Sequence, residues 1–301
     1  LLGKVQKRFA PIANRDIKKG DVLFQEAPDV VAITDLSGPE GSFCDHCTAK
    51  LSEGMEVFKC EKHADAVYCS EVCRTKGFGL YHVYVCKARK EASDALEHLR
   101  RYCREDAKSG LGLLMLRYVA MLLTEELKGN SAALSGPFLH YDNLPQLFPE
   151  AGEAEKREAE LIRSIFSTSN DNLADFLSDR IYASMKATLH RACFSFSAYN
   201  PLAINETDKV EAFRKVIGDN QDCDATGLYH LAAHLPHSCQ PNAELGMDGS
   251  KIKAIAINDI SAGEPLSISF VPVDHIEDVA MRKEKLFLNF MIDCQCMACQ
   301  N

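Results

Sequence analysis

The chain has 301 residues, 46% of them hydrophobic, and a formal net charge of −9 at pH 7. A chain of this length can bury a large core and suits two or three small modules better than one. The acidic balance argues against nucleic acid as the main partner, because affinity for a duplex rests on neutralised phosphates. It is compatible with a basic peptide partner or simply with solubility.

The remaining composition favours an intracellular protein. The longest apolar run, residues 111–123, is interrupted by Arg117 and is too short to span a bilayer. Of thirteen cysteines, Cys103, Cys193 and Cys223 stay outside the metal-binding patterns described below. This odd set of free thiols indicates a reducing compartment, cytoplasmic and/or nuclear. We expect neither a membrane segment nor a secretory signal, and we expect a monomer.

The first predicted element is a strand close to the N-terminus. A turn at Lys19, Gly20 and Asp21 precedes the apolar run that starts at Val22. Such punctuation followed by branched and aromatic residues is typical of a strand. A linker rich in Gly, Pro and Ser then follows at residues 37–42.

Four pairs of cysteines and histidines come next and give the strongest signal in the chain. Two ligands separated by two or three residues can reach one zinc ion from a single tight turn. Four such pairs therefore predict two closed structural zinc sites, with a redox role as the less favoured alternative. The pairs are Cys44-x2-Cys47, Cys60-x2-His63, Cys69-x3-Cys73 and His82-x3-Cys86.

The middle of the chain predicts helices. Between residues 111 and 122, apolar side chains recur at spacings of three and four, which places them on one buried helix face. Residues 153–166 repeat the pattern with a charged outer face, and we interpret both stripes as core. Pro145, Pro149 and Gly152 mark the break between these helices.

Short strands are predicted in the last third of the chain. The candidate segments are residues 193–199, 243–245, 251–256 and 266–270. Residues 247–250 read as a hairpin turn between two of them, and residues 258–264 as a second turn.

A second group of cysteines lies at the C-terminal end of this sequence. Cys294-x-Cys296-x2-Cys299 supplies three thiolates, so a tetrahedral zinc site needs a fourth ligand from elsewhere. The best candidate is Cys239, within the segment Pro-His-Ser-Cys-Gln-Pro-Asn at residues 236–242. The sequence therefore predicts a third zinc site, joining two distant segments.

Together these motifs resemble a known family. Cys44 to Cys86, with Tyr-Cys-Ser at residues 68–70, resembles a MYND zinc finger. His237-Ser-Cys-x-Pro-Asn followed by Cys-x-Cys-x2-Cys resembles the SET domain and its post-SET zinc loop. Their order is similar to that of SET-and-MYND (SMYD-type) protein lysine methyltransferases over nearly the whole chain. Because many members continue into a C-terminal helical domain, we expect a short form of the family, or a chain that has been cut.

The resemblance implies an α+β fold, with a SET-domain β core, a helical insert, a MYND double-zinc finger and a post-SET zinc loop. It divides the chain into residues 1–40 and 191–273 for the SET core, 41–87 for the finger, 88–190 for the insert and 274–301 for the zinc loop. MYND fingers of the family dock peptides, so it implies a protein or peptide partner at the finger or in an open cleft. The implied zinc ligands are Cys44, Cys47, Cys69 and Cys73 for the first ion, Cys60, His63, His82 and Cys86 for the second, and Cys239, Cys294, Cys296 and Cys299 for a third.

The resemblance also implies S-adenosylmethionine as cofactor, yet most of its signature residues are replaced. In the family, a Gly-x-Gly turn, two asparagines and a histidine contact the cofactor, and two tyrosines line the lysine channel. Only the histidine remains. The matching cofactor positions here are Arg8, Phe9, Ala10, Ala192, Pro236 and His237, and the catalytic candidates are His237, Phe270 and Phe290.

These replacements leave three hypotheses for function. Loss of one oriented hydroxyl removes roughly 2–4 kcal/mol of transition-state stabilisation, so several losses would slow methyl transfer by powers of ten. The chain is a methyltransferase with a divergent, weakened site, a non-catalytic peptide-binding scaffold (a pseudoenzyme), or a SET pocket repurposed for another small molecule. In the last case His237 would act as acid or base, with Tyr199, Tyr229, His230 or His234 nearby in the sequence. Alternatively, His237 is a structural histidine hydrogen-bonded where two loops cross.

Overall fold

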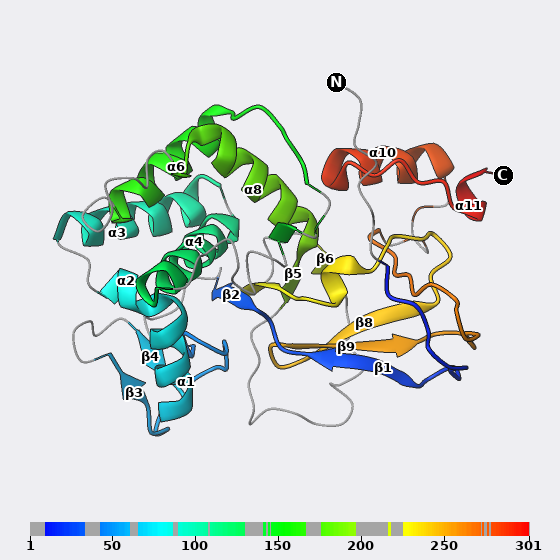
Figure 1. Ribbon diagram of the computed structural model, residues 1–301, viewed down its shortest axis with the longest axis horizontal. Helices are drawn as coiled ribbons and strands as arrows, with labels where there is room; N and C mark the ends of the chain where they lie inside the picture. The colour runs from blue at the N-terminus through cyan, green and yellow to red at the C-terminus, as the bar shows by residue number, and fades with distance from the viewer. Residues whose placement is uncertain are drawn as a thin grey trace.

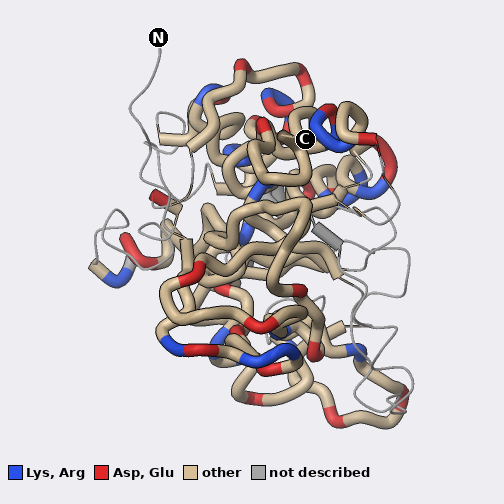
Figure 2. Tube along the Cα trace, turned by 90° about the vertical axis from the view of Figure 1, so that its right-hand side faces the viewer, with Lys and Arg blue, Asp and Glu red and all other residues tan. Residues whose placement is uncertain are grey.

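The computed structural model describes most of the chain. Within the described part, no helix is both long and apolar enough to cross a membrane. Figure 2 shows basic and acidic residues interspersed along the chain trace. The described residues are 10–33, 43–60, 66–86, 90–107, 109–129, 141–142, 144, 146–166, 176–196, 216–217, 225–271, 273, 276 and 278–300.

Two antiparallel sheets combine strands from opposite ends of the chain. In one, β9 (Lys251–Ala256) lies between β1 (Val22–Glu26) and β8 (Ala243–Asp248). The other has the order β2 (Val30–Ile33), β7 (Ala225–Leu228), β5 (Cys193–Phe196) and β6 (Val216–Ile217). Figure 1 shows the N-terminal strand β1 beside β9, so the two halves of the β region form one unit.

The predicted hairpin is confirmed in the first sheet. β8 and β9 are joined at Gly249 and Ser250, and Gly249 has a φ of 63°, which a side chain would disfavour. Along β9, Ile252, Ala254 and Ala256 are buried and the residues between them are more exposed. This alternation places one face of the sheet in the core.

The strand predicted at residues 266–270 is wrong as a regular strand. Only Ile268 makes a ladder contact there, an isolated bridge to His237. Pro265 has no backbone N–H, and two later backbone donors bond to side chains, Ser267 N to Asn242 Oδ1 at 2.9 Å and Phe270 N to His237 Nδ1 at 2.9 Å. Leu266 N and Ile268 N donate to the backbone oxygens of Pro11 and Pro236. The segment is extended and uses both backbone and side-chain acceptors, so no regular ladder forms.

Helices pack together on one side of the β region (Figure 1). They are α3 (Lys90–Glu105), α4 (Leu111–Leu127), α6 (Glu153–Phe166) and α8 (Asp179–Ala192). The helix predicted at α4 is confirmed, and Leu114, Met115, Tyr118 and Val119 are fully buried. The expectation of one buried face is wrong, because residues 111–116 and 118–124 are buried on all sides of the helix. α8 continues directly into β5, so its last turn lies next to the SET-like strands.

The zinc-finger region is small and joined to the helices by Arg117 of α4. Arg117 Nη1 donates to Val31 O at 2.8 Å and to Asp45 O at 2.6 Å, and its Nη2 bonds to Asp45 Oδ1. Its guanidinium also lies over the Tyr81 ring, 4.7 Å from the centroid. One side chain therefore connects finger, sheet and helices. The finger elements are β3 (Phe58–Lys59), β4 (Val67–Tyr68), α1 (Glu71–Gly77), the π-helical turn η1 (Phe78–His82) and α2 (Val83–Cys86).

The C-terminal part consists of two helices around the last cysteines. α10 (Val279–Phe290) ends at Met291, which adopts a left-handed conformation with a φ of 52°. The chain then turns back toward the sheets and ends in α11 (Met297–Gln300). Between the sheets, a short 3-10 turn, η3 (Ala232–His234), precedes the His237 segment.

A buried ion pair links α6 and α8. Lys186 Nζ lies 2.8 Å from Glu158 Oε2 and 3.2 Å from Glu155 Oε1, and the Tyr182 hydroxyl donates to Glu158 at 2.7 Å. The Glu158 side chain is only 2% exposed. Burial alone would lower the pKa of Lys186, but the two carboxylates raise it above its usual value. The pair is therefore charged and depends on both partners.

We expect Lys186→Met to lower the free energy of unfolding by about 3–5 kcal/mol, because it leaves the Glu158 charge buried without its cation. Urea denaturation measures the change. Lys156→Met is the matched control, since Lys156 pairs with the exposed Glu153 and its loss should leave stability nearly unchanged. Equal effects of the two substitutions would contradict a dependence on the buried pair.

Candidate functional site

The first cysteine cluster lies in the finger and has the geometry of a zinc site. The Sγ atoms of Cys44, Cys47, Cys69 and Cys73 all lie within 4.8 Å of one another, and Cys69 Sγ is 3.6 Å from both Cys47 and Cys73. A tetrahedral ion with Zn–S bonds of about 2.3 Å separates its sulfurs by about 3.8 Å. The donor set and spacing therefore fit zinc.

Local structure explains why these cysteines converge. Ser70 caps α1 by accepting the Cys73 N–H at 3.2 Å, which places Cys69 directly before the cap and Cys73 in the first turn of the helix. A hydrogen bond from Cys47 lowers the pKa of the Cys44 thiol to about 5, against the opposing effect of burial. A thiolate is the form that binds zinc.

The second predicted finger site stays a prediction. Cys60 and His82 are buried, and the Tyr68 ring lies edge-on to His82 with centroids 6.1 Å apart. His63 lies outside the described residues, as does the side chain of Cys86. Only half of this ligand set is therefore placed.

The post-SET cluster joins two distant segments. The Sγ atoms of Cys239, Cys294, Cys296 and Cys299 lie within 4.8 Å of one another, with Cys239 at 3.5 Å from Cys299 and 4.0 Å from Cys294. Burial raises the pKa of Cys294 to about 11, so this thiol needs a cation to stabilise the thiolate form that binds metal. The structure thus places Cys239 where a fourth ligand is needed.

His237 lies between this cluster and a pocket. Its Nδ1 accepts the backbone N–H of Phe270 at 2.9 Å, and its Nε2 lies 3.3 Å from Cys239 Sγ. Because Nδ1 is an acceptor, Nε2 carries the proton of the neutral ring and donates toward the sulfur, as second-layer histidines do at metal sites. These contacts are those expected of a structural histidine at a loop crossing, one of the alternatives that the sequence left open.

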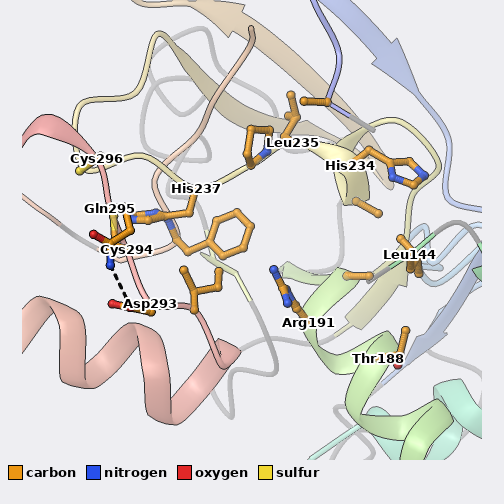
Figure 3. Close-up of a pocket in the computed structure, with 16 residues that line it drawn as sticks. Leu144, Thr188, Arg191, His234, Leu235, His237, Asp293, Cys294, Gln295 and Cys296 are labelled. Atoms are coloured by element: carbon orange, nitrogen blue, oxygen red, sulfur yellow. Dashed lines mark hydrogen bonds between the residues drawn. The ribbon is translucent and has the colours of Figure 1, made fainter. Parts of the chain in front are cut away.

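The pocket encloses about 340 Å³, within the usual range for small-molecule sites. It lies where α8, the His237 segment and the C-terminal loop meet (Figure 3). Its walls are mostly apolar, but Arg191 and the polar side chains of Thr188, His234, His237, Asp293 and Gln295 also border it. The lining residues are Ala10, Leu144, Thr188, Arg191, Ala192, Ala233, His234, Leu235, Pro236, His237, Phe270, Ile292, Asp293, Cys294, Gln295 and Cys296.

Comparison with known proteins identifies the family. The SET domain matches residues 9–271. The chain belongs to the SET domain family. Curated relatives include histone-lysine N-methyltransferase SMYD3 of Mus musculus, 24% identical over 284 residues, which are 94% of this chain and 57% of that protein.

Two further relatives extend the match. Histone-lysine N-methyltransferase SET5 of Saccharomyces cerevisiae is 24% identical over 318 residues, 96% of this chain and 58% of the relative. Protein-lysine N-trimethyltransferase SMYD5 of Gallus gallus is 23% identical over 348 residues, 95% and 82% of the two chains. The chain thus spans little more than half the length of SMYD3 and SET5. The resemblance to SET-and-MYND methyltransferases is confirmed.

The SET pocket brings together most, but not all, of the positions predicted for the cofactor and channel. Ala10, Ala192, Pro236, His237 and Phe270 line it. Phe290 lies behind it, with its ring centroid 5.3 Å from that of Phe270. Arg8, Phe9 and Tyr199 lie outside the described residues.

The other side chains considered for acid or base chemistry lie in different places. Tyr229 is buried and donates to Ser250 O at 2.7 Å. His230 packs against His234, with ring centroids 6.0 Å apart, and His234 lines the SET pocket. Sequence reasoning did not single out Arg191 or Ile292, although Arg191 directly precedes the predicted position Ala192.

We expect Cys239→Ser to remove one zinc ion per chain and to speed proteolysis near Cys294, because the C-terminal loop loses its tie to the SET core. Elemental analysis and limited proteolysis with mass mapping measure both effects. Cys103→Ser is the control, as this buried cysteine lies outside both clusters. Unchanged zinc content and unchanged cleavage near Cys294 would count against the shared site.

Proposed function

We propose that this chain binds S-adenosylmethionine in the SET pocket and methylates protein lysine side chains at a reduced rate. The observation that carries the proposal is the convergence of cofactor and channel positions from separate segments on one pocket. The relatives named as histone-lysine or protein-lysine methyltransferases support the same reaction class. The converging positions are Ala10, Ala192, Pro236, His237 and Phe270.

The chemistry of the pocket fits a nucleoside with an amino-acid tail. Leu144, Leu235 and Ile292 supply apolar wall, and Arg191 and His234 supply polar contacts, the usual composition of a small-molecule site. Ala10, Ala192, Pro236 and His237 would hold the cofactor. When bound, S-adenosylmethionine supplies an activated methyl group. The surrounding side chains exclude water and orient the groups that react.

The aromatic pair explains why a reduced rate is proposed. Phe270 and Phe290 pack with centroids 5.3 Å apart at positions where the family resemblance places tyrosines. Their rings can form an apolar wall beside a lysine side chain. Desolvation there favours the neutral amine, which is the nucleophile. They offer no hydroxyl to orient it.

We expect Phe270→Tyr to raise the rate of methyl transfer about 100-fold, because one oriented hydroxyl donor is worth roughly that factor in other active sites. Transfer of radiolabelled methyl groups from S-adenosylmethionine to histones and lysine-rich peptides measures the rate. Phe287→Tyr is the matched control, as Phe287 is 58% exposed on α10. A Phe270→Tyr protein that binds cofactor yet transfers no methyl group would favour the scaffold.

The alternative function is a non-catalytic peptide-binding scaffold, favoured by the missing hydroxyls at residues 270 and 290. A repurposed pocket with His237 as acid or base has less support, because both ring nitrogens already face partners, Phe270 N and Cys239 Sγ. Such chemistry would have to break one of these contacts. A small-molecule ligand other than the cofactor would then need His234 as its polar contact.

The rest of the organisation is proposed on the same basis. Residues 41–87 would form the MYND finger, 88–190 the helical insert and 274–301 the post-SET loop, with residues 1–40 and 191–273 as the SET core. We propose three zinc ions per chain. Two would occupy the cysteine clusters, and Cys60, His63, His82 and Cys86 would bind the other. A basic protein substrate and a cytoplasmic or nuclear location accord with the relatives named as acting on histones.

A further inference from the structure

Arg191 is a cationic side chain in the SET pocket that the family resemblance does not explain. It occupies the last turn of α8, and Figure 3 shows its side chain projecting from the helix toward the centre of the pocket. Among the described residues that line the pocket, it is the one lysine or arginine. Within the described lining, Arg191 is therefore the one fixed positive charge, on the wall formed by α8, and Asp293 is the one carboxylate.

The other basic side chains in the last two turns of α8, His190 and Lys186, do not supply this charge to the pocket. Burial lowers the pKa of His190, with Lys186 adding to the effect, so this imidazole is neutral at physiological pH. Lys186 itself faces Glu158 and Glu155 in the buried pair between α6 and α8. Lys186 is thus held by its own ion pairs between α6 and α8.

The replaced residues leave a chemical gap that a guanidinium can fill. Ala192 and Pro236 stand where the resemblance expects asparagines, so two amides that would bind a polar cofactor are missing. Arg191 adjoins Ala192 in the chain, and both line the same pocket as Pro236. A guanidinium binds a carboxylate through two parallel hydrogen bonds, more strongly than a neutral amide does.

We propose that Arg191 binds the carboxylate at the amino-acid end of the cofactor, in place of the amides lost at residues 192 and 236. The inference rests on the proposed function, because it assigns a ligand group within the same pocket. It predicts that affinity depends on the carboxylate of the ligand and not only on its nucleoside. An arginine that only complements the C-terminal end of the α8 dipole would show no such dependence.

Two probes separate these roles in calorimetric titrations of the zinc-loaded chain. S-Adenosylhomocysteine carries the carboxylate, whereas 5′-methylthioadenosine has the same nucleoside and a thioether but no amino-acid end. We expect Arg191→Ala to weaken S-adenosylhomocysteine binding roughly 10- to 100-fold, the range for a charged hydrogen bond. Binding of 5′-methylthioadenosine should change less than about twofold, since the variant removes no contact to it.

Two further variants control for charge and for folding. Arg191→Lys should recover part of the lost affinity, because it keeps the charge without the two-pronged geometry. Arg180→Ala removes an exposed arginine from the first turn of the same helix and should leave both ligands unaffected.

The outcomes distinguish this inference from the function on which it rests. If the unaltered chain binds S-adenosylhomocysteine but Arg191→Ala weakens both ligands equally, or neither, the carboxylate contact is wrong while the cofactor site stands. If the unaltered chain binds neither ligand at millimolar concentration, the proposed function fails and this inference fails with it.

Discussion

The four-cysteine cluster at the C-terminal loop is the constraint on which the SET pocket depends. Cys239 comes from the segment after η3, and its three partners come from the loop after α10. The same loop contributes Ile292, Asp293 and Gln295 to the pocket wall. Holding four sulfurs together therefore also closes the pocket on one side. His237 couples the two features, since its ring contacts both Cys239 and Phe270.

The zinc-finger region is likewise attached to the rest of the chain by a small polar cluster, centred on Arg117. Arg117 reaches from α4 to backbone and side-chain oxygens of Asp45 and to Val31 O in β2. Asp45 lies next to Cys44, so the clamp acts directly on the first cysteine cluster. The C-terminal cysteine cluster and the Arg117 contacts each depend on a few directional polar or metal-binding groups. Such groups fix the relative position of two segments more narrowly than apolar packing does.

The elements that the sequence predicted are those set by short-range patterns. The limits of α6 follow from helical periodicity, and the β8–β9 hairpin follows from its turn residues. α4 was predicted as a helix, but its burial on nearly all sides comes from the helices and strands packed around it. The two cysteine clusters follow from ligand spacing, because zinc requires closely placed donors. Cys239 was found by counting thiolates and by resemblance, since nothing local connects it with Cys294.

The features that sequence reasoning missed are those set by tertiary contacts. The extended segment at residues 266–270 forms no regular strand because two of its backbone donors, Ser267 N and Phe270 N, bond to the side chains of Asn242 and His237, which periodicity does not reveal. Arg191 has the pattern of an ordinary helix end, and only the position of α8 beside the C-terminal loop turns it toward a pocket. Long-range assembly of this kind is visible only in the folded chain.

The central claim is that one ligand site is built from α8, the His237 segment and the C-terminal loop. Hydrogen-exchange mass spectrometry of the zinc-loaded chain, with and without S-adenosylhomocysteine, tests it most directly. The account predicts that peptides covering residues 188–193, 232–238 and 290–296 gain protection together, at the same ligand concentration. Protection of none of these segments at millimolar ligand, or of a region elsewhere in the chain alone, would contradict it.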